Sequence, residues 1–506
     1  MMGRKERAFG PLPPVTLEEL VPPEHFYRHL ERVVDLSFVR DLVGEVYADS
    51  GRPSIDPVVF FKLQLVMFFE GLRSERQLLR VVADRLSLRW QLGYDLNQAL
   101  PDHSSLSRIR QRYGLDVFRR FFETVVEQCS ATGLVWGREL YFDATKVEAN
   151  ASLDSVAPRF AVETHLRALF TATEASEKSD EGEDGDGPIL LPVELSPEAR
   201  TTLAETAAGR HDWIGNAGRP DRSVIRGDYR RVADYRASFT DPDASLMRCR
   251  GGGLDLGYHD HYVVDGGKAR IILATLVTPA EVMENQPMLD LLWRVCFRWK
   301  VWPHHVTGDT TYGTTEIIVA VEDAGIRAYV PLPDFDHRTR LFGRDRFIYE
   351  AERDVYHCPG GQELRFRKHK HTERTRVYQA PVAACNACVL KTQCTTSAKG
   401  RLLKRSFDEA DLDRIRGYHT TEPYAKAMRK RKVWVEPLFA EAKAWHGLHR
   451  FRLRGLENVN SEALLIAAGQ NLKRLLSYRG WGRRPCPSGA TGVVLPALPS
   501  LPALTP

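Results

Sequence analysis

Three acidic residues stand in settings that suit metal chemistry. Asp143 ends the run Glu139-Leu-Tyr-Phe-Asp143, Asp309 ends His305-Val-Thr-Gly-Asp309, and Glu436 lies in a basic segment. Magnesium prefers carboxylate oxygens and keeps several waters, so few protein ligands suffice. Two such ions about 4 Å apart can hold both the attacking and the leaving oxygen of a phosphoryl transfer. Two strand-borne acids and one helix-borne acid would therefore form a phosphodiester-cleaving site if the fold brings them together.

Each of these acids also has a purely structural explanation. An Asp that closes a strand often caps a turn. Gly308 and Gly313 make the Asp309 segment more specific, because small residues let a metal or a phosphate approach the backbone.

A helix over 429–446 would place Lys432, Glu436 and Lys443 on one face. The same row of charges is also a common surface ion-pair arrangement, worth only tenths of a kcal/mol. The predicted buried stripe of this helix is Val435, Leu438, Phe439, Ala442 and Trp445.

Four of the eight cysteines fall within a short stretch, at Cys358, Cys385, Cys388 and Cys394. A closed set of four thiolates is typical of a structural zinc site. Reduced structural thiols are the alternative, and His357, His369 or His371 could replace the distant Cys358 as a ligand. The other cysteines, Cys129, Cys249, Cys296 and Cys486, have no ligand spacing.

The elements that must position the acids follow from local patterns. The pattern of residues 15–135 predicts a series of helices. Helix starts are expected at Asp56-Pro57, at Ser74-x-x-Gln77 and near Asp102. Strands are predicted at 138–147, 257–264, 269–277, 304–309 and 326–332, and helices at 280–299 and 314–324. This order predicts an α/β fold with a mixed sheet and helical cover.

Charge is unevenly distributed along the 506 residues, whose net charge is only +5. Residues 174–187 contain seven acids and one Lys, whereas residues 425–454 contain nine Lys or Arg and two Glu. The basic stripe suits a phosphate backbone, although such runs are often solvated faces. No signal peptide or membrane span is recognisable, so we expect a cytoplasmic protein with reduced cysteines.

A series of motifs in a fixed order makes a more specific pattern than any one of them. The chain resembles the DDE transposases of bacterial insertion sequences, in the subgroup with a cysteine-bearing insert. The resemblance covers roughly residues 20–480 and rests on Gly51-Arg-Pro-Ser-Ile-Asp-Pro57, Pro101-Asp-His-Ser-Ser-Leu-Ser107, Tyr141-Phe-Asp-Ala-Thr-Lys146, Thr240-Asp-Pro-Asp-Ala244, Gly308-Asp-Thr-Thr-Tyr-Gly313, Val435-Glu-Pro-Leu-Phe439, Gly447-Leu-His-Arg-Phe-Arg-Leu-Arg-Gly455 and Asn471-Leu-Lys-Arg474.

The resemblance implies an RNase H-like sheet in which Asp143, Asp309 and Glu436 bind Mg²⁺ or Mn²⁺. It implies double-stranded DNA as the substrate and a dimer or higher oligomer as the active species. In the family an Arg often stands four residues before the Glu; here that position is Lys432, beside Arg431. The residues expected to contact DNA are Arg431, Lys432, Lys443, Arg450, Arg452, Arg454, Arg108 and Arg110.

The predicted organisation has five parts. Residues 1–135 form a helical DNA-binding domain, 136–333 the first part of the catalytic core with a partly disordered insertion at 152–235, and 334–400 a cysteine-rich insert. Residues 401–480 complete the core, and 481–506 form a disordered Pro-rich tail. Two other functions remain open at this point: a nuclease of the same fold without strand transfer, and a DNA-binding derivative without catalysis.

Overall fold

The computed structural model describes residues 15–47, 54–158, 236–249, 252–333 and 340–482. The acidic run 174–187, most of the predicted insertion and all but the first two residues of the predicted tail lie outside the described residues.

The N-terminal part is helical, as predicted. The caps predicted from sequence are present: the Asp56 side chain accepts from the Val58 N–H, and Ser74 accepts from Gln77. The helices are α1 (Leu17–Leu20), α2 (Phe26–Val33), α3 (Phe38–Val43), α4 (Pro57–Phe69), α5 (Glu75–Asp84), α6 (Leu86–Leu92) and α7 (His103–Ala131).

Helix α7 continues past a glycine, Gly114, in its first half. Gly114 has a φ of 64° and ψ of 179°, so the helix breaks there and resumes at once. Glycine adopts this backbone conformation without steric strain. The apolar side of the second half, including Phe118, Phe121 and Val125, is buried.

A six-stranded mixed sheet forms the centre of the molecule, and the predicted RNase H-like α/β fold is confirmed. Strand β5 pairs antiparallel with β1, β4 and β6, whereas β7 and β8 run parallel to β1 on its other side. The strands are β1 (Glu139–Glu148), β4 (Ser245–Arg248), β5 (Leu254–Asp265), β6 (Ile272–Pro279), β7 (His305–Thr307) and β8 (Arg327–Tyr329).

Two helices connect the strands of this sheet. Helix α11 (Met288–Trp299) links β6 to β7, and α12 (Thr315–Asp323) links β7 to β8. The predicted start of the first helix at 280 was wrong, because residues 280–287 form turns. A small separate ladder pairs β2 (Val156–Pro158) with β3 (Arg236–Ser238).

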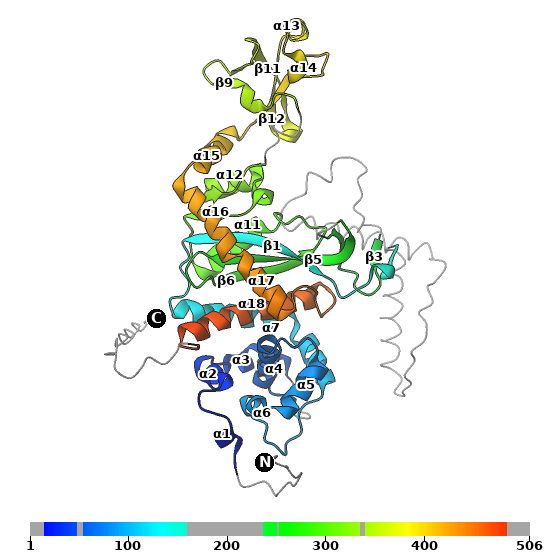
Figure 1. Cartoon of the computed structure of the whole chain (residues 1–506), viewed down its shortest axis with the longest axis vertical. Helices are drawn as coiled ribbons and strands as arrows, with labels where there is room; N and C mark the ends of the chain where they lie inside the picture. Colours follow the sequence, from blue (N-terminus) through cyan, green and yellow to red (C-terminus); the bar gives the residue numbers. More distant parts are fainter. Residues whose placement is uncertain (1–14, 48–53, 159–235, 250–251, 334–339, 483–506) are drawn as a thin grey trace, which may run out of the picture.

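Four C-terminal helices cover the sheet: α15 (Glu409–His419), α16 (Glu422–Trp434), α17 (Glu436–His446) and α18 (Leu456–Tyr478). Helix α18 lies between the sheet and the N-terminal helices, where it contacts β6 and α7 (Figure 1). One continuous apolar core therefore runs from Tyr27 to Leu476. The N-terminal helices and the sheet share this core and are not separate globules.

The cysteine-bearing insert is a second, five-stranded antiparallel sheet at one end of the molecule (Figure 1). Its strands are β9 (Ile348–Glu350), β10 (Val355–His357), β11 (Glu363–Lys370), β12 (Thr375–Gln379) and β13 (Leu402–Ser406), with α13 (Val382–Asn386) and α14 (Lys391–Cys394) between the last two. Because β13 pairs with β12, the insert extends beyond the predicted boundary at residue 400.

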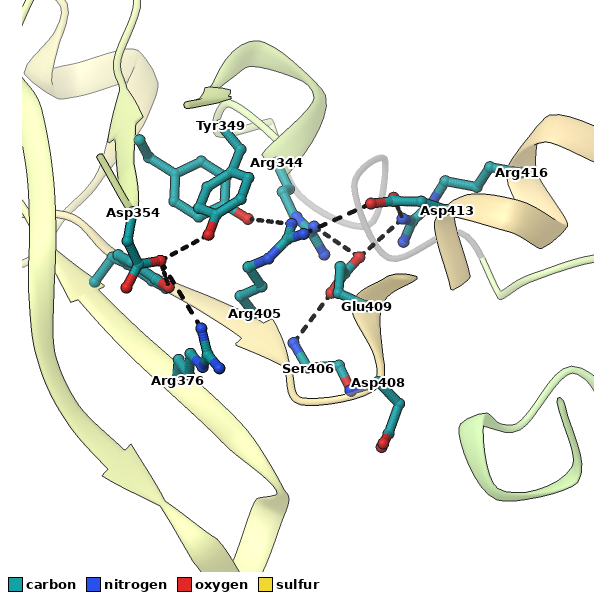
Figure 2. A network of polar contacts seen from close by, with 12 residues as sticks. Arg344, Tyr349, Asp354, Arg376, Arg405, Ser406, Asp408, Glu409, Asp413 and Arg416 are labelled. Atoms are coloured by element: carbon teal, nitrogen blue, oxygen red, sulfur yellow. Dashed lines mark hydrogen bonds and ion pairs between the residues drawn. The ribbon is translucent and has the colours of Figure 1, made fainter. Parts of the chain in front are cut away.

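A buried carboxylate joins the insert to the C-terminal helices. Glu409, at the start of α15, is 2% exposed and forms ion pairs with Arg344 and Arg416. It also accepts from the Ser406 N–H at the end of β13 (Figure 2). Breaking such a buried pair leaves an uncompensated charge, so this network ties the insert firmly to α15.

No helix in the described part of the chain is long and apolar enough to cross a membrane.

Candidate active site

The register of two parallel strands brings Asp143 and Asp309 together. Strand β1 pairs with β7 up to Tyr141 opposite Thr307. Asp143 and Asp309 each lie two residues beyond this last pair. Adjacent strands are about 4.8 Å apart and side chains alternate between faces, so both carboxylates lie on the same face, close enough for Asp309 to raise the pKa of Asp143. Asp143 is nevertheless in the middle of β1, opposite Tyr262 of β5, and not at a strand end as predicted.

Asp143 is in an environment that disfavours its charge. The residue is 9% exposed, and burial raises the pKa of its carboxyl to about 7. The guanidinium of Arg431 opposes this rise, whereas the nearby Asp309 and Glu284 carboxylates add to it. Like charges in close proximity destabilise one another and need a cation between them. The site is thus built to attract positive charge.

The turn after β7 fixes Asp309. Its carboxylate accepts from the Thr311 N–H at 2.8 Å and begins a short 3-10 turn. The Tyr312 ring folds back over Gly308, where a Cβ atom would lie 2.7 Å from the ring. A Cβ at Gly313 would lie 2.3 Å from the Pro331 carbonyl oxygen. The two glycines are therefore required by close packing that holds the Asp309 turn.

Glu436 is the first residue of helix α17, and this corrects the predicted continuous helix over 429–446. The chain breaks at Val435 between α16 and α17, and Pro437 stands in the first turn of α17. Proline has no N–H to donate to the preceding turn, so a helix tends to begin there. Val435, Leu438, Phe439 and Ala442 are buried as predicted, but Trp445 is 73% exposed.

Arg431 joins two members of the acidic triad. Its Nη1 atom lies 3.1 Å from Asp143 Oδ2, and its Nη2 atom lies 3.8 Å from Glu436 Oε1. The Arg431 side chain is 13% exposed, whereas that of Glu436 is 53% exposed. Lys432, which occupies the family position for this cation, is exposed. The arginine one residue earlier is therefore the one that faces the carboxylates.

A fourth acid, Glu284, was missed by the sequence reasoning. It lies in the turns between β6 and α11, and burial together with Asp309 raises the pKa of its carboxyl. Its Oε1 atom is 3.8 Å from His259 Nε2. Nothing in its local sequence marks it, because only the tertiary fold brings residues 280–287 beside β1 and β7.

Lys443 is directed at the sheet and not at open solvent. Its Nζ atom donates to the Lys146 carbonyl oxygen at 2.9 Å. Its positive charge also lowers the pKa of Asp260 of β5. This acid is fully buried and accepts a hydrogen bond from the Thr275 hydroxyl. Burial raises the pKa of Asp260 to about 8, against the opposing effects of Thr275 and Lys443.

Two of the predicted DNA-contacting arginines are interior residues, and this part of the prediction is corrected. Arg110 is 6% exposed and forms an ion pair with Glu75, itself 8% exposed. The Arg452 Nη1 atom lies 3.3 Å from the same Glu75 carboxylate. Both side chains are needed to neutralise a buried acid, which leaves them unavailable to a phosphate.

Arg450 and Arg454 bind the backbone that follows β1. Arg450 donates to the carbonyl oxygens of Ala149 and Ala151, and Arg454 donates to that of Asn150. Arg108 is exposed on α7 and remains a candidate for DNA contact.

The four cysteines of the insert converge on one cavity of about 20 Å³. The Arg401 N–H donates to Cys385 Sγ, and the Gln362 N–H donates to Cys358 Sγ, each at 3.3 Å. A Cβ at Gly360 would lie 3.0 Å from Cys388 Sγ, so glycine lets the chain pass close to the sulfurs. His357 instead contacts Glu350, and neither His369 nor His371 lines the cavity.

Among the residues the structure describes, no group of three or more His, Cys, Asp or Glu side chains is arranged to hold a metal ion as it stands. The donor chemistry nevertheless fits: hard carboxylate oxygens meet around Arg431, and four sulfurs, two of which accept a backbone N–H, meet in the insert. Carboxylates suit magnesium and thiolates suit zinc.

Two separate segments of the chain match known family models. Residues 15–112 match the family model Transposase domain (DUF772), and residues 357–476 match the model Transposase DDE domain. The second match includes Glu436 and the whole cysteine cluster. No curated protein and no solved structure matches the chain. The two models, in this order around an RNase H-like sheet, support a DDE transposase of the insertion-sequence type.

Proposed function

We propose that this transposase binds the terminal inverted repeats of its own insertion sequence, hydrolyses phosphodiester bonds there and joins the freed 3′-hydroxyl ends to target DNA. The observation that carries the proposal is the register of β1 and β7, which sets Asp143 beside Asp309 on the sheet face covered by α17. Arg431 then links Asp143 to Glu436 across nearly 300 residues of sequence.

In this proposal Asp143, Asp309 and Glu436 hold two divalent ions, Mg²⁺ or Mn²⁺. When bound, such ions activate the attacking hydroxyl and stabilise the leaving oxygen. The protein would contribute by positioning these groups. The β1–β7 pairing positions Asp143 and Asp309, the break at Val435 directs the first turn of α17 toward them, and Tyr312 lies beside both carboxylates.

Arg431 has a defined role in the proposal. A guanidinium between Asp143 and Glu436 neutralises the acids and prevents their mutual repulsion. The two pairings occupy the Arg431 guanidinium, so the exposed Lys432 beside it is the cation proposed to contact the DNA backbone next to the cleaved bond.

The two ends of the DNA substrate bear on the oligomeric state of the protein. An insertion sequence has two ends, so the active species is proposed to be a dimer or a higher oligomer on DNA. The alternative functions weighed from the sequence, a nuclease without strand transfer and an inactive DNA-binding derivative, predict different products from the same substrate.

Substitution of the triad tests the proposal. Asp143→Asn, Asp309→Asn and Glu436→Gln are each expected to abolish magnesium-dependent cleavage of duplexes that carry the element's ends, with binding retained. Asp323→Asn, at the exposed end of α12, is the matched control and should cleave normally. Cleavage by any of the three triad variants would refute the assignment.

A strand-transfer assay separates a transposase from a nuclease. Pre-cleaved ends with a free 3′-hydroxyl are incubated with a supercoiled plasmid and magnesium, and the products are sequenced. Joined products support the proposal. Cleavage without joining would instead identify a nuclease.

We further propose that Cys358, Cys385, Cys388 and Cys394 hold a structural zinc ion in the insert. Backbone N–H groups directed at sulfur stabilise the thiolate form that binds zinc. Metal analysis of the purified chain should find about one zinc per molecule. Cys388→Ser should lose it, whereas Cys296→Ser, a buried cysteine of α11, should keep it. Zinc-free wild type would contradict this role.

A further inference from the structure

The sheet of the insert has one closed face and one open face. Tyr356, Leu364, Tyr378 and Leu403 point into the small apolar core of the insert. Side chains alternate along a strand, so the neighbours of these residues point the other way. That outer face is solvent-exposed along most of β11, the strand Glu363–Lys370.

Strand pairing gathers cations on the outer face. Directly opposite residues of antiparallel strands share a face. Lys368 is opposite Val377, and Val377 is opposite Lys404. Lys370 is opposite Thr375, and Arg365 is opposite Gln379, which lie on the same side as Val377. We call Arg365, Lys368, Lys370 and Lys404, together with Arg367, the basic face.

A register irregularity in β11 makes this gathering possible. Pairing with β12 shifts between Phe366 and Lys368, which leaves Arg367 as an extra residue. Arg365 and Lys368 are three positions apart and would point to opposite faces in a regular strand. The inserted residue restores them to the same side, as expected for a β-bulge.

The acids nearby do not cancel this charge. Residues 340–406 contain 15 Lys or Arg and six Asp or Glu, a net +9 that exceeds the +5 of the whole chain. Glu363 is shared by Arg353 and Arg365, and Glu373 is shared by Lys370 and Lys404.

The cations of the basic face are also accessible. The side chains of Arg365, Lys404 and Lys370 are 76%, 56% and 42% exposed. Arg367 and Lys368 are exposed and form no ion pair with a described residue.

We propose that the basic face binds the sugar-phosphate backbone of duplex DNA, as a contact additional to the triad and the basic segment 425–454. Closely spaced cations on a solvent-exposed sheet face suit the regularly spaced phosphates of duplex DNA. The central sheet separates this face from the N-terminal helices along the long axis of the molecule (Figure 1). The contact lengthens the DNA tract that one chain holds, and the inference rests on the proposed function for its substrate.

The test compares charge removal on and off the basic face in the full-length chain. The R367Q/K368Q variant removes two exposed cations that bind no acid. Lys391→Gln with Lys399→Gln removes the same charge from the cysteine loop of the same insert. Binding to a random-sequence duplex is followed by fluorescence anisotropy over a series of NaCl concentrations.

The expected result is a loss of two phosphate contacts from the basic face alone. The slope of log K against log salt concentration should fall in magnitude by about 1.8 for R367Q/K368Q and by less than about 0.5 for the cysteine-loop control. Lys368→Gln alone should give about half of the first change. Unchanged thermal unfolding of the variants verifies that the insert is folded.

Three outcomes would overturn the inference. An unchanged slope in R367Q/K368Q excludes phosphate contact, and an equal change in the cysteine-loop control shows dependence on net charge only. Polyglutamate that competes as well as DNA would indicate a surface for acidic protein. A wild-type chain that binds no duplex would instead refute the proposed function, so the two failures are distinguishable.

Discussion

The basic segment 425–454 and the cysteine-bearing insert both carry strong positive charge, but they use it in opposite ways. In the basic segment, Lys430 pairs with Glu139, Arg431 with Asp143, and Arg452 with Glu75. In the insert, each acid near the basic face serves two cations and the guanidinium and ammonium groups stay in solvent. The net charge of a segment thus does not reveal whether its cations can reach a ligand. What reveals this is the number of buried acids that the cations must neutralise.

The physical reason is the position of each segment relative to the core. Residues 425–454 pack against the central sheet and place Val435, Leu438 and Phe439 in the main core, beside which an unpaired charge is strongly disfavoured. The outer face of β11 covers nothing, because the apolar core of the insert lies on the other side. Charges that face water are hydrated and need no partner.

The largest expected effect comes from the buried acid that two arginines share. Glu75→Gln removes the carboxylate paired with both Arg110 and Arg452 and leaves Glu462 as the nearby acid for two buried guanidinium groups, so the free energy of unfolding should fall by about 3–5 kcal/mol. Urea denaturation measures the change. Arg108→Gln, two residues from Arg110 but exposed, should change stability by less than about 0.5 kcal/mol. If Glu75→Gln were equally mild, the interior role of these arginines would be wrong.

A smaller effect is expected where an arginine holds backbone. Arg450→Gln removes hydrogen bonds to the Ala149 and Ala151 carbonyl oxygens and should destabilise the fold by about 1–2 kcal/mol. The salt dependence of DNA binding should stay unchanged, because the guanidinium is occupied by the chain itself. A slope reduced by about 0.9 would show that Arg450 contacts a phosphate and would break the comparison.

The smallest change in stability belongs to the basic face. R365Q with K404Q removes two exposed ion pairs and should alter the free energy of unfolding by less than about 1 kcal/mol. The same variant should weaken DNA binding at low salt more than at high salt. A stability loss as large as that of Glu75→Gln would show that Arg365 and Lys404 neutralise buried acids, as Arg110 and Arg452 do.

Much of the central fold was accessible from the sequence. The helix caps at Asp56 and Ser74 and the approximate positions of the central strands follow from local patterns, whereas a common site for Asp143 and Asp309 came only from the family resemblance. The break at Val435 was also marked, since Pro437 is a helix-start signal, but the apolar spacing on both sides favoured one helix.

The remainder depends on tertiary contacts that local patterns do not encode. Arg110 of α7 pairs with Glu75 of α5, and Glu284 in the turns after β6 approaches Asp309 after β7. Each pair joins two different elements of the fold. Strand β11 was not predicted, because its run of cations and its irregular register hide the two-residue period. Trp445 faces solvent, whereas the next residue, His446, stacks on Phe68 of α4.

Helix α18 gives the molecule an order of completion during synthesis. Ribosomes release a chain from its N-terminus, and early domains usually fold first. Here the apolar sides of α7 and β6 lack their cover until Leu456–Tyr478 has emerged, and Glu436 is synthesised only shortly before that helix. An unfinished polypeptide therefore has neither a closed core nor a complete set of carboxylates. Under the proposed function, DNA cleavage would therefore require translation of the last described helix to be nearly complete.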